Sequence, residues 1–98
     1  MNEALSELKN IDRTIHEPAR LMIVAILSAV EEADFLYLLK ATELTKGNLS
    51  SHLSRLEKVG YVAIEKSFVG KMPRTVCRLT ETGGSALESY RKQMKRVI

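Results

Sequence analysis

The sequence predicts a mostly α-helical single domain that carries one small β-hairpin. Apolar residues recur at helical spacing in several segments before residue 60 and again after residue 80. Between these segments, residues 61–79 are rich in β-branched and aromatic residues and surround a turn that contains glycine and proline. The chain has 98 residues, enough for one hydrophobic core but not for two. We therefore expect residues 1–98 to fold as one domain.

The first two helices are predicted from apolar spacing and from one proline. In the N-terminal segment, residues 1–16, apolar side chains recur about every 3.5 residues, which indicates a helix over residues 2–15. Pro18 suits the first turn of a second helix, where its missing N–H costs nothing. This second helix extends to about Val30 and is apolar almost all round, so we expect it at the centre of the core.

Residues 17–60 are predicted to form a three-helix core that contains a helix-turn-helix. After the central helix, Asp34 is a good N-cap for a short helix from Phe35 to about Ala41. Thr45 caps the next helix, and Gly60 stands where a left-handed residue ends it. The apolar positions of that helix fall on one face: Leu49, Leu53 and Leu56.

The β-rich segment is predicted to be a hairpin. Its strands cover residues 61–69 and 74–80, and the turn between them spans residues 70–73. The final segment, residues 80–98, is predicted to be a helix capped by Thr80 or Thr82.

The first and last helices each carry a narrow apolar seam that lacks an obvious partner in so small a core. A short terminal helix is marginal in water unless its apolar stripe is covered. Pairing of the chain with a second copy would cover both seams, so we expect a homodimer. The residues expected at its interface are Leu5, Leu8, Ile15, Leu87, Tyr90 and Met94.

Charge is distributed unevenly along the chain. Residues 1–44 hold four Lys or Arg against eight Asp or Glu, whereas residues 45–98 hold eleven against four. The two parts therefore carry net charges of −4 and +7. A polyanion is the partner that such a basic half would attract.

The order of elements indicates what the basic half binds. A helix, a short helix, a tight turn, a second capped helix and a basic hairpin make up the winged helix-turn-helix arrangement. We expect the recognition helix, about residues 45–59, to enter the major groove of double-stranded DNA and the wing, about residues 66–74, to meet the backbone or minor groove. The candidate DNA-binding residues are Thr45, Lys46, Gly47, Asn48, Ser50, Ser51, Ser54, Arg55, Lys58, Lys66, Lys71 and Arg74.

These candidates have different expected roles. Lys46 and the hydroxyl of Thr45 suit phosphate oxygens, because a helix N-terminus carries partial positive charge. Asn48 and Arg55 have side chains that can read adenine or guanine edges. The serines on the outward face permit close approach to the bases. Lys71 and Arg74 suit phosphates at the hairpin tip.

Three other interpretations stay open at this stage. The outward face of the helix and the hairpin charges also describe an ordinary solvated surface. A winged helix can serve as a protein-interaction module without touching DNA, although such a module does not need positive charge concentrated on the helix, hairpin and tail. RNA binding is less favoured, because no aromatic stacking surface is evident.

Other function classes find little support in the residues. We find no Gly-rich phosphate loop, no nucleophile with an evident base and no His or Cys pair at metal-ligand spacing, so we expect neither an enzyme, nor a metal site, nor a cofactor. No apolar run is long enough for a membrane span and no signal peptide is evident, so we expect a cytoplasmic protein. His16 and His52 are expected to pack or cap, with a phosphate contact as the alternative for His52. Cys77, the only cysteine, is expected to be a plain partly buried residue, with a redox role or an intersubunit disulfide as the alternatives.

Three segments resemble the winged helix-turn-helix transcriptional regulators of the MarR-like and ArsR-like group, in particular their short single-domain archaeal and bacterial members. Residues 17–27 are similar to the opening helix of that group, with Pro-x-Arg before an Ile-Leu pair. Residues 49–62 are similar to its recognition helix and entry to the wing, and residues 78–83 to its Leu-Thr-x-x-Gly signature. The resemblance covers about residues 15–90.

The resemblance implies a transcriptional regulator whose terminal helices form the dimer. It implies that Lys71 and Arg74 meet the backbone or minor groove. It also implies that seven residues of the recognition helix face the major groove: Lys46, Gly47, Asn48, Ser50, Ser51, Ser54 and Arg55. Two departures are visible: Thr42 and Glu43 stand at the bend where many members have glycine, and the paired cysteines of metal-sensing relatives are absent.

Overall fold

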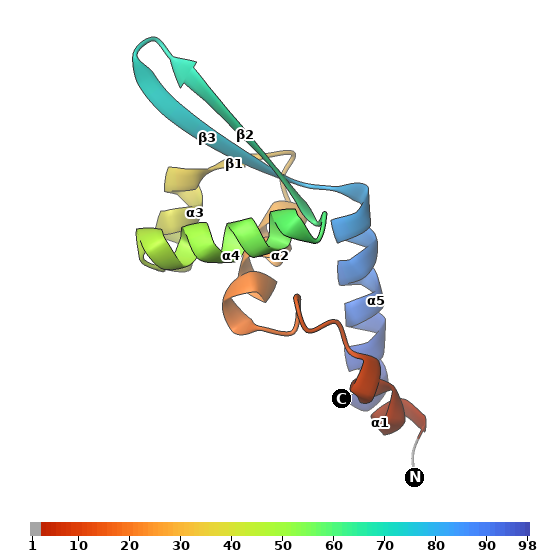
Figure 1. The fold of residues 1–98 in the computed structure, drawn as a ribbon. Helices are drawn as coiled ribbons and strands as arrows, with labels where there is room; N and C mark the ends of the chain where they lie inside the picture. Colours follow the sequence, from red (N-terminus) through yellow and green to blue (C-terminus); the bar gives the residue numbers. More distant parts are fainter. Residues whose placement is uncertain (1–2) are drawn as a thin grey trace.

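The computed structural model describes residues 3–98 of the chain (Figure 1). In that range it contains five α-helices, one short 3-10 turn and one three-stranded antiparallel sheet. In chain order the elements are α1 (Glu3–Glu7), the 3-10 turn Leu8–Asn10, α2 (Pro18–Ser28), β1 (Ala33–Asp34), α3 (Phe35–Thr42), α4 (Lys46–Lys58), β2 (Val62–Val69), β3 (Met72–Leu79) and α5 (Glu81–Val97). This is the mostly helical fold with a hairpin wing that the sequence predicts.

The core forms where α2, α3 and α4 pack against one another and against the base of the wing. Its fully buried side chains come from all of these elements, because each presents one apolar face inward. They include Ile23, Val24 and Leu27 of α2, Leu38 of α3, Leu49, Leu53 and Leu56 of α4, Val62 of β2 and Cys77 of β3. The predicted inward face of α4 is therefore confirmed.

The helix-turn-helix is fixed by side-chain caps at each helix start. The Asp34 carboxylate accepts a hydrogen bond from the backbone N–H of Tyr37 at 2.7 Å, and the Thr45 hydroxyl accepts one from Asn48 at 3.1 Å. The turn between α3 and α4 passes through Glu43, whose φ of 58° is left-handed. Such a conformation favours glycine, so the structure explains why the resemblance implies glycine near this bend.

The end of α4 sets the direction of the wing. Gly60 has a φ of 83°, and its N–H donates to the carbonyl of Glu57, while the N–H of Tyr61 donates to the carbonyl of Leu56. This pair of bonds closes the helix and satisfies two of its last carbonyls. The predicted left-handed helix end at Gly60 is confirmed.

The sheet has the order β1-β3-β2, and the wing is its longest part. β2 and β3 pair over their whole lengths, from Val62 opposite Leu79 to Val69 opposite Met72. The outer half of this hairpin projects beyond the helical body (Figure 1). A two-residue turn of Gly70 and Lys71 joins the strands, with Gly70 at a φ of 64°.

The hairpin turn is tighter than the sequence indicates. The prediction of a four-residue turn over residues 70–73 is wrong, because Met72 and Pro73 belong to β3. Pro73 lies opposite Phe68. Val69 and Met72, which flank the turn, form a hydrogen-bonded pair. Pro73 therefore stands at the next, non-hydrogen-bonded position, where no N–H is needed.

The N-terminal helix is shorter than predicted. The expected helix over residues 2–15 ends at Glu7, and a 3-10 turn follows it; Met1 and Asn2 lie outside the described residues. Beyond Asn10 the chain is held in a turn by Asp12, whose carboxylate accepts hydrogen bonds from the N–H groups of Thr14 and Ile15. A local side-chain bond of this kind competes with helix formation.

This turn changes the interpretation of the terminal seams. Ile15, Leu87 and Tyr90, three of the residues expected at a dimer interface, are 0%, 3% and 7% exposed in the single chain. The prediction that their seams lack a partner inside the domain is wrong for these three residues. The turn brings Ile15 into the core, and His16 Nδ1 lies 2.8 Å from the Tyr90 hydroxyl in a hydrogen bond. Leu5 stays 50% exposed, and Leu8 and Met94 are half-buried.

Candidate nucleic-acid interface

The outward face of α4 is polar, small and accessible. The candidate residues on this helix are all exposed, while the Leu49 face is buried beneath them. They are Thr45, Lys46, Gly47, Asn48, Ser50, Ser51, Ser54, Arg55 and Lys58. Every candidate of the recognition helix is thus accessible, on the sides of α4 that do not face the core. These side chains are small or polar, so a duplex can approach the helix closely.

Two hollows flank this face of α4. One lies between α4 and the wing and is lined by Ser50, Ser54 and Glu57 on the helix and by Lys66 and Thr75 on the strands. The other lies on the opposite side, where Ser51, Ser54, Arg55 and Lys58 surround Thr14. Ser54 lines both hollows, so it marks the centre of the exposed face.

The second hollow includes a residue that the sequence pattern does not indicate. Thr14 belongs to the turn between the N-terminal segment and α2, and it lies beside Arg55 and Lys58. Thr14 therefore extends the candidate surface. No local pattern could have found this residue, because a long-range fold brings the turn next to α4.

Arg20 attaches this turn to the recognition helix. Its Nε donates to the carbonyl of Thr14 at 2.6 Å, and its Nη1 lies 3.1 Å from Nδ1 of His52. Because an arginine only donates, Nδ1 of His52 acts as the acceptor. His52 is thus a packing residue that supports the helix, which agrees with the first of the two expectations for it.

The wing carries the three remaining candidates. Lys66, Lys71 and Arg74 are exposed, and the two-residue turn places Lys71 at the tip. Strand alternation puts Lys66 on the face that turns toward α4 and Arg74 on the opposite face. The three candidates of the wing therefore lie on both faces and at the tip of the hairpin, and not all on the face that turns toward α4.

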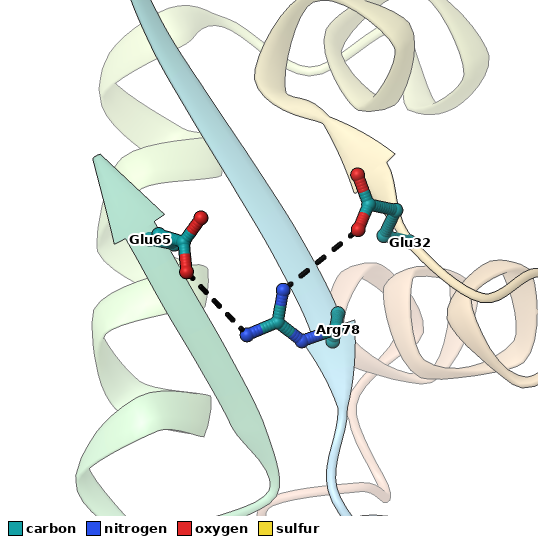
Figure 2. A network of polar contacts seen from close by, with 3 residues as sticks. All are labelled: Glu32, Glu65 and Arg78. Atoms are coloured by element: carbon teal, nitrogen blue, oxygen red, sulfur yellow. Dashed lines mark ion pairs between the residues drawn. The ribbon is translucent and has the colours of Figure 1, made fainter. Parts of the chain in front are cut away.

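Arg78 is a wing cation that the structure assigns to another role. Its guanidinium lies 3.8 Å from Glu32 and 3.8 Å from Glu65, between β1 and β2 (Figure 2). These pairs are largely exposed, so each contributes little to stability. Their consequence is electrostatic: Arg78 offsets part of the negative charge of Glu65, the acidic residue that interrupts the basic hairpin, and part of that of Glu32.

The other cations of the surface stand free of carboxylates. Within residues 3–98, the ion pairs involve Arg78, Arg91 and Arg96. The candidate cations take part in none of them: Lys46, Arg55, Lys58, Lys66, Lys71 and Arg74. Glu57 is an acidic residue within this surface, in the same hollow as Lys66.

The base of the wing contains two titratable groups with shifted pKa values. Burial and a hydrogen bond to the Asp12 carboxylate, whose Oδ2 lies 2.5 Å from the hydroxyl, raise the pKa of Tyr61 to about 12. Burial, with smaller contributions from Glu57 and Asp34, raises the pKa of Cys77 to about 11. Cys77 is fully buried, which disfavours the reactive thiolate. Its burial is more complete than the partial burial predicted.

No group of three or more His, Cys, Asp or Glu residues in the described part of the chain could hold a metal ion. No helix among these residues is long and apolar enough to cross a membrane.

The fold and this surface define a winged helix-turn-helix protein. Residues 19–98 match the family model for the winged helix DNA-binding domain, and the chain belongs to that family. The predicted class is confirmed: this is a winged-helix DNA-binding regulator.

Several known proteins are similar to the chain. The transcriptional regulator homologue protein from Pyrococcus horikoshii OT3 superposes with a TM-score of 0.87 at 32% identity, over 98% of this chain and 94% of that one. An uncharacterized protein of Methanocaldococcus jannaschii is 37% identical over 71 residues, which cover 72% of this chain and 77% of the relative. A putative transcriptional regulator of the MarR family from Enterococcus faecalis V583 has a TM-score of 0.77 at 21% identity, over 93% and 82% of the two chains, and shares the fold.

Proposed function

We propose that this protein binds double-stranded DNA as a homodimer, with α4 in the major groove and the wing on the backbone or minor groove, and that it regulates transcription there. The observation that carries the proposal is the surface of α4 and the wing. Six exposed cations on it have no carboxylate partner within residues 3–98, so their charge is available to phosphates.

Within this surface the residues divide into two groups. Lys46 at the start of α4 and Lys71 and Arg74 on the wing hold the phosphate backbone and set the register of the protein on the duplex. Asn48 and Arg55 stand on the exposed face of α4, and their planar side chains read base edges. The serines between them let the helix approach the groove closely.

A groove beside α5 supports the homodimer. It is lined by apolar side chains of α2 and α5, and its rim is charged. Ala25 and Ile98 are exposed in it, while Leu21 and Met94 are half-buried. A second copy packed against this groove would cover the apolar lining and place two α4 helices on successive major grooves, about 34 Å apart.

The proposal predicts how the phosphate-contacting residues behave. Lys71→Ala and Arg74→Ala should weaken binding to every duplex about equally, because phosphates carry no sequence information. Each should also reduce the slope of log affinity against log salt by about 0.9 for every phosphate that the variant no longer neutralises. Fluorescence anisotropy of a labelled duplex at four salt concentrations measures both effects. Lys9→Ala, an exposed cation on the N-terminal 3-10 turn, is the control and should change neither.

The base-reading residues should behave differently. Asn48→Ala and Arg55→Ala should cost about 1–3 kcal/mol on a duplex selected in vitro with the full chain and much less on a scrambled duplex. Equal losses on both duplexes would remove the reading role from these two residues. If the wild-type chain binds no duplex at low salt, the proposal fails and the protein-interaction alternative takes its place.

A further inference from the structure

The tip of the wing is apolar, which a purely phosphate-contacting hairpin does not require. Phe68, Val69 and Met72 are 73%, 62% and 70% exposed, and Pro73 is exposed beside them. Among the described residues they are some of the most exposed large apolar side chains, and they gather at one point of the molecule. A concentrated exposed apolar cluster marks a binding surface.

The strand register gives this cluster the shape of a wedge. Phe68 lies opposite Pro73 on one face of the hairpin, and Val69 lies opposite Met72 on the other face. A flat partner covers only one face of a hairpin and would leave two of these side chains in water. A partner with two walls covers both faces at once.

The cations of the wing indicate the charge of those walls. Lys66 stands one step behind Phe68 on the first face, and Arg74 stands one step behind Met72 on the second. Lys71 lies in the turn itself, and residues 66–74 contain no acidic side chain. Each face thus offers apolar surface at the tip and one positive charge behind it. The minor groove of DNA has the matching order, with stacked bases at its floor and a phosphate strand along each wall.

We infer that the tip of the wing enters the minor groove and inserts Phe68 or Met72 partly between two base pairs, which unstacks them and kinks the duplex. The inference rests on the proposed DNA-binding function and adds deformation of the DNA to it. Apolar side chains inserted in this way bend DNA toward the major groove. Residues 65–74 are exposed on both strands, a projection of about 16 Å that exceeds the groove depth of about 7.5 Å.

The test uses the full chain and a closed circular plasmid. The plasmid is relaxed by a topoisomerase in the presence of protein and then freed of protein, so any unwinding stays as a change in linking number. The wild-type chain should lower the linking number in proportion to the protein bound. Phe68→Ser combined with Met72→Ser should abolish this change at equal occupancy and weaken binding by about tenfold.

Three control variants accompany this pair. Lys71→Ala should bind more weakly yet keep the linking-number change at equal occupancy, because it removes charge and not the wedge. Phe68→Leu should retain most of the change. Met22→Ser, an exposed methionine on α2, should behave as the wild type. The thermal midpoints of all variants report whether the domain still folds.

The outcomes separate the two proposals. If the wild-type chain binds the plasmid without changing its linking number, or if the double serine variant changes it as the wild type does, the wedge is refuted and DNA binding stands. If the wild-type chain binds no plasmid, both proposals fall. Binding to phosphatidylglycerol vesicles, but not to plasmid, that disappears in the double serine variant would assign the tip to a membrane surface and overturn the inference.

Discussion

Gly83 and Gly84 are neighbours in the first turns of α5, but their surroundings differ. A Cβ added to Gly83 would collide with the backbone carbonyl oxygen of Tyr61 and with Leu79. The same carbonyl accepts a hydrogen bond from the N–H of Thr80, so it cannot move freely. Gly84 has only a methyl carbon of Leu79 near its would-be Cβ, at 4.0 Å. The close approach of α5 to the wing therefore depends on one glycine and not on the other.

Alanine at these two positions should have opposite effects on stability. Gly84→Ala should raise the free energy of unfolding by about 0.5–1 kcal/mol, because alanine loses less backbone entropy in a helix. Gly83→Ala should lower it by about 2 kcal/mol or more, because the backbone of Tyr61 must shift. Urea unfolding followed by circular dichroism measures both. A stabilising Gly83→Ala would contradict the packing described for α5.

Tyr61 gives the base of the wing a dependence on alkaline pH. Its pKa in the folded chain is about 12, raised by burial and by the hydrogen bond to Asp12, against about 10 in an unfolded chain. Between these values the unfolded chain has lost the hydroxyl proton while the folded chain still holds it. Stability therefore falls as pH rises from about 10 to 12 and is unaffected by this group below that window.

Replacing the hydroxyl tests this dependence. Tyr61→Phe should be less stable than the wild type at pH 7 by about 1 kcal/mol, because the hydrogen bond is removed. The difference should shrink as pH rises from about 10 to 12. In that window the unfolded wild-type chain gains stability by losing the Tyr61 proton, whereas phenylalanine has no such proton to lose. Tyr37→Phe, at a residue 54% exposed, is the matched control for the loss of a tyrosine hydroxyl outside this hydrogen bond. Denaturant midpoints from about pH 7 to 11 provide the measurement.

At the scale of elements, the sequence predicts those helices that are determined by interactions between residues close together in the chain. Thr45, the inward leucines and Gly60 together define α4, since a cap, a helical stripe and a left-handed end all lie within its own sequence. The exposed face of α4 follows from the same stripe. These parts of the candidate site were therefore visible in the sequence.

The elements that were missed depend on distant partners. β1 has only two residues, Ala33 and Asp34, and exists because β3 pairs with it. The N-terminal stripe indicated one long helix, but Asp12 bonds to the turn and to Tyr61, which lies 49 positions further on. Thr14 reaches the surface of α4 through the same turn. Apolar periodicity alone contains no information about such contacts.

The whole molecule is more extended than a compact domain of its size. Its radius of gyration is 14.9 Å, against about 13 Å expected for a globular chain of this length. Its longest dimension is 59 Å, with 25 and 21 Å across. The wing projects from one end of the body, and α1 packs beside the C-terminal part of α5 at the other (Figure 1). The surface proposed for DNA thus lies far from α1 and the C-terminal end of α5.

The N-terminal helix belongs to the α5 end of the molecule. Glu7 accepts a hydrogen bond from Arg96 at 2.8 Å, which joins the two ends of the chain. Leu5 stays half exposed there, and the apolar groove between α2 and α5 lies on the same long helix. Leu5 and the groove therefore both lie where a second copy could cover them without blocking the wing.

The proposed dimer predicts a specific response to charge in this groove. Ala25→Asp and Met94→Asp each place a carboxylate on its apolar lining, and two-fold pairing would bury that charge without a partner, which is strongly unfavourable. Each variant should shift the wild-type dimer to a monomer in sedimentation velocity at micromolar concentration. Both should also bind a two-half-site duplex more weakly, because only one α4 then engages at a time.

Met22→Asp, on the same helix as Ala25 but outside the groove, is the matched control and should stay dimeric. Tyr90 is unsuitable for this test, because it is buried and bonded to His16, so that its replacement would damage the fold itself. A wild-type chain that sediments as a monomer both free and on DNA would refute the dimer, whereas a dimer that survives both aspartates would place the interface elsewhere.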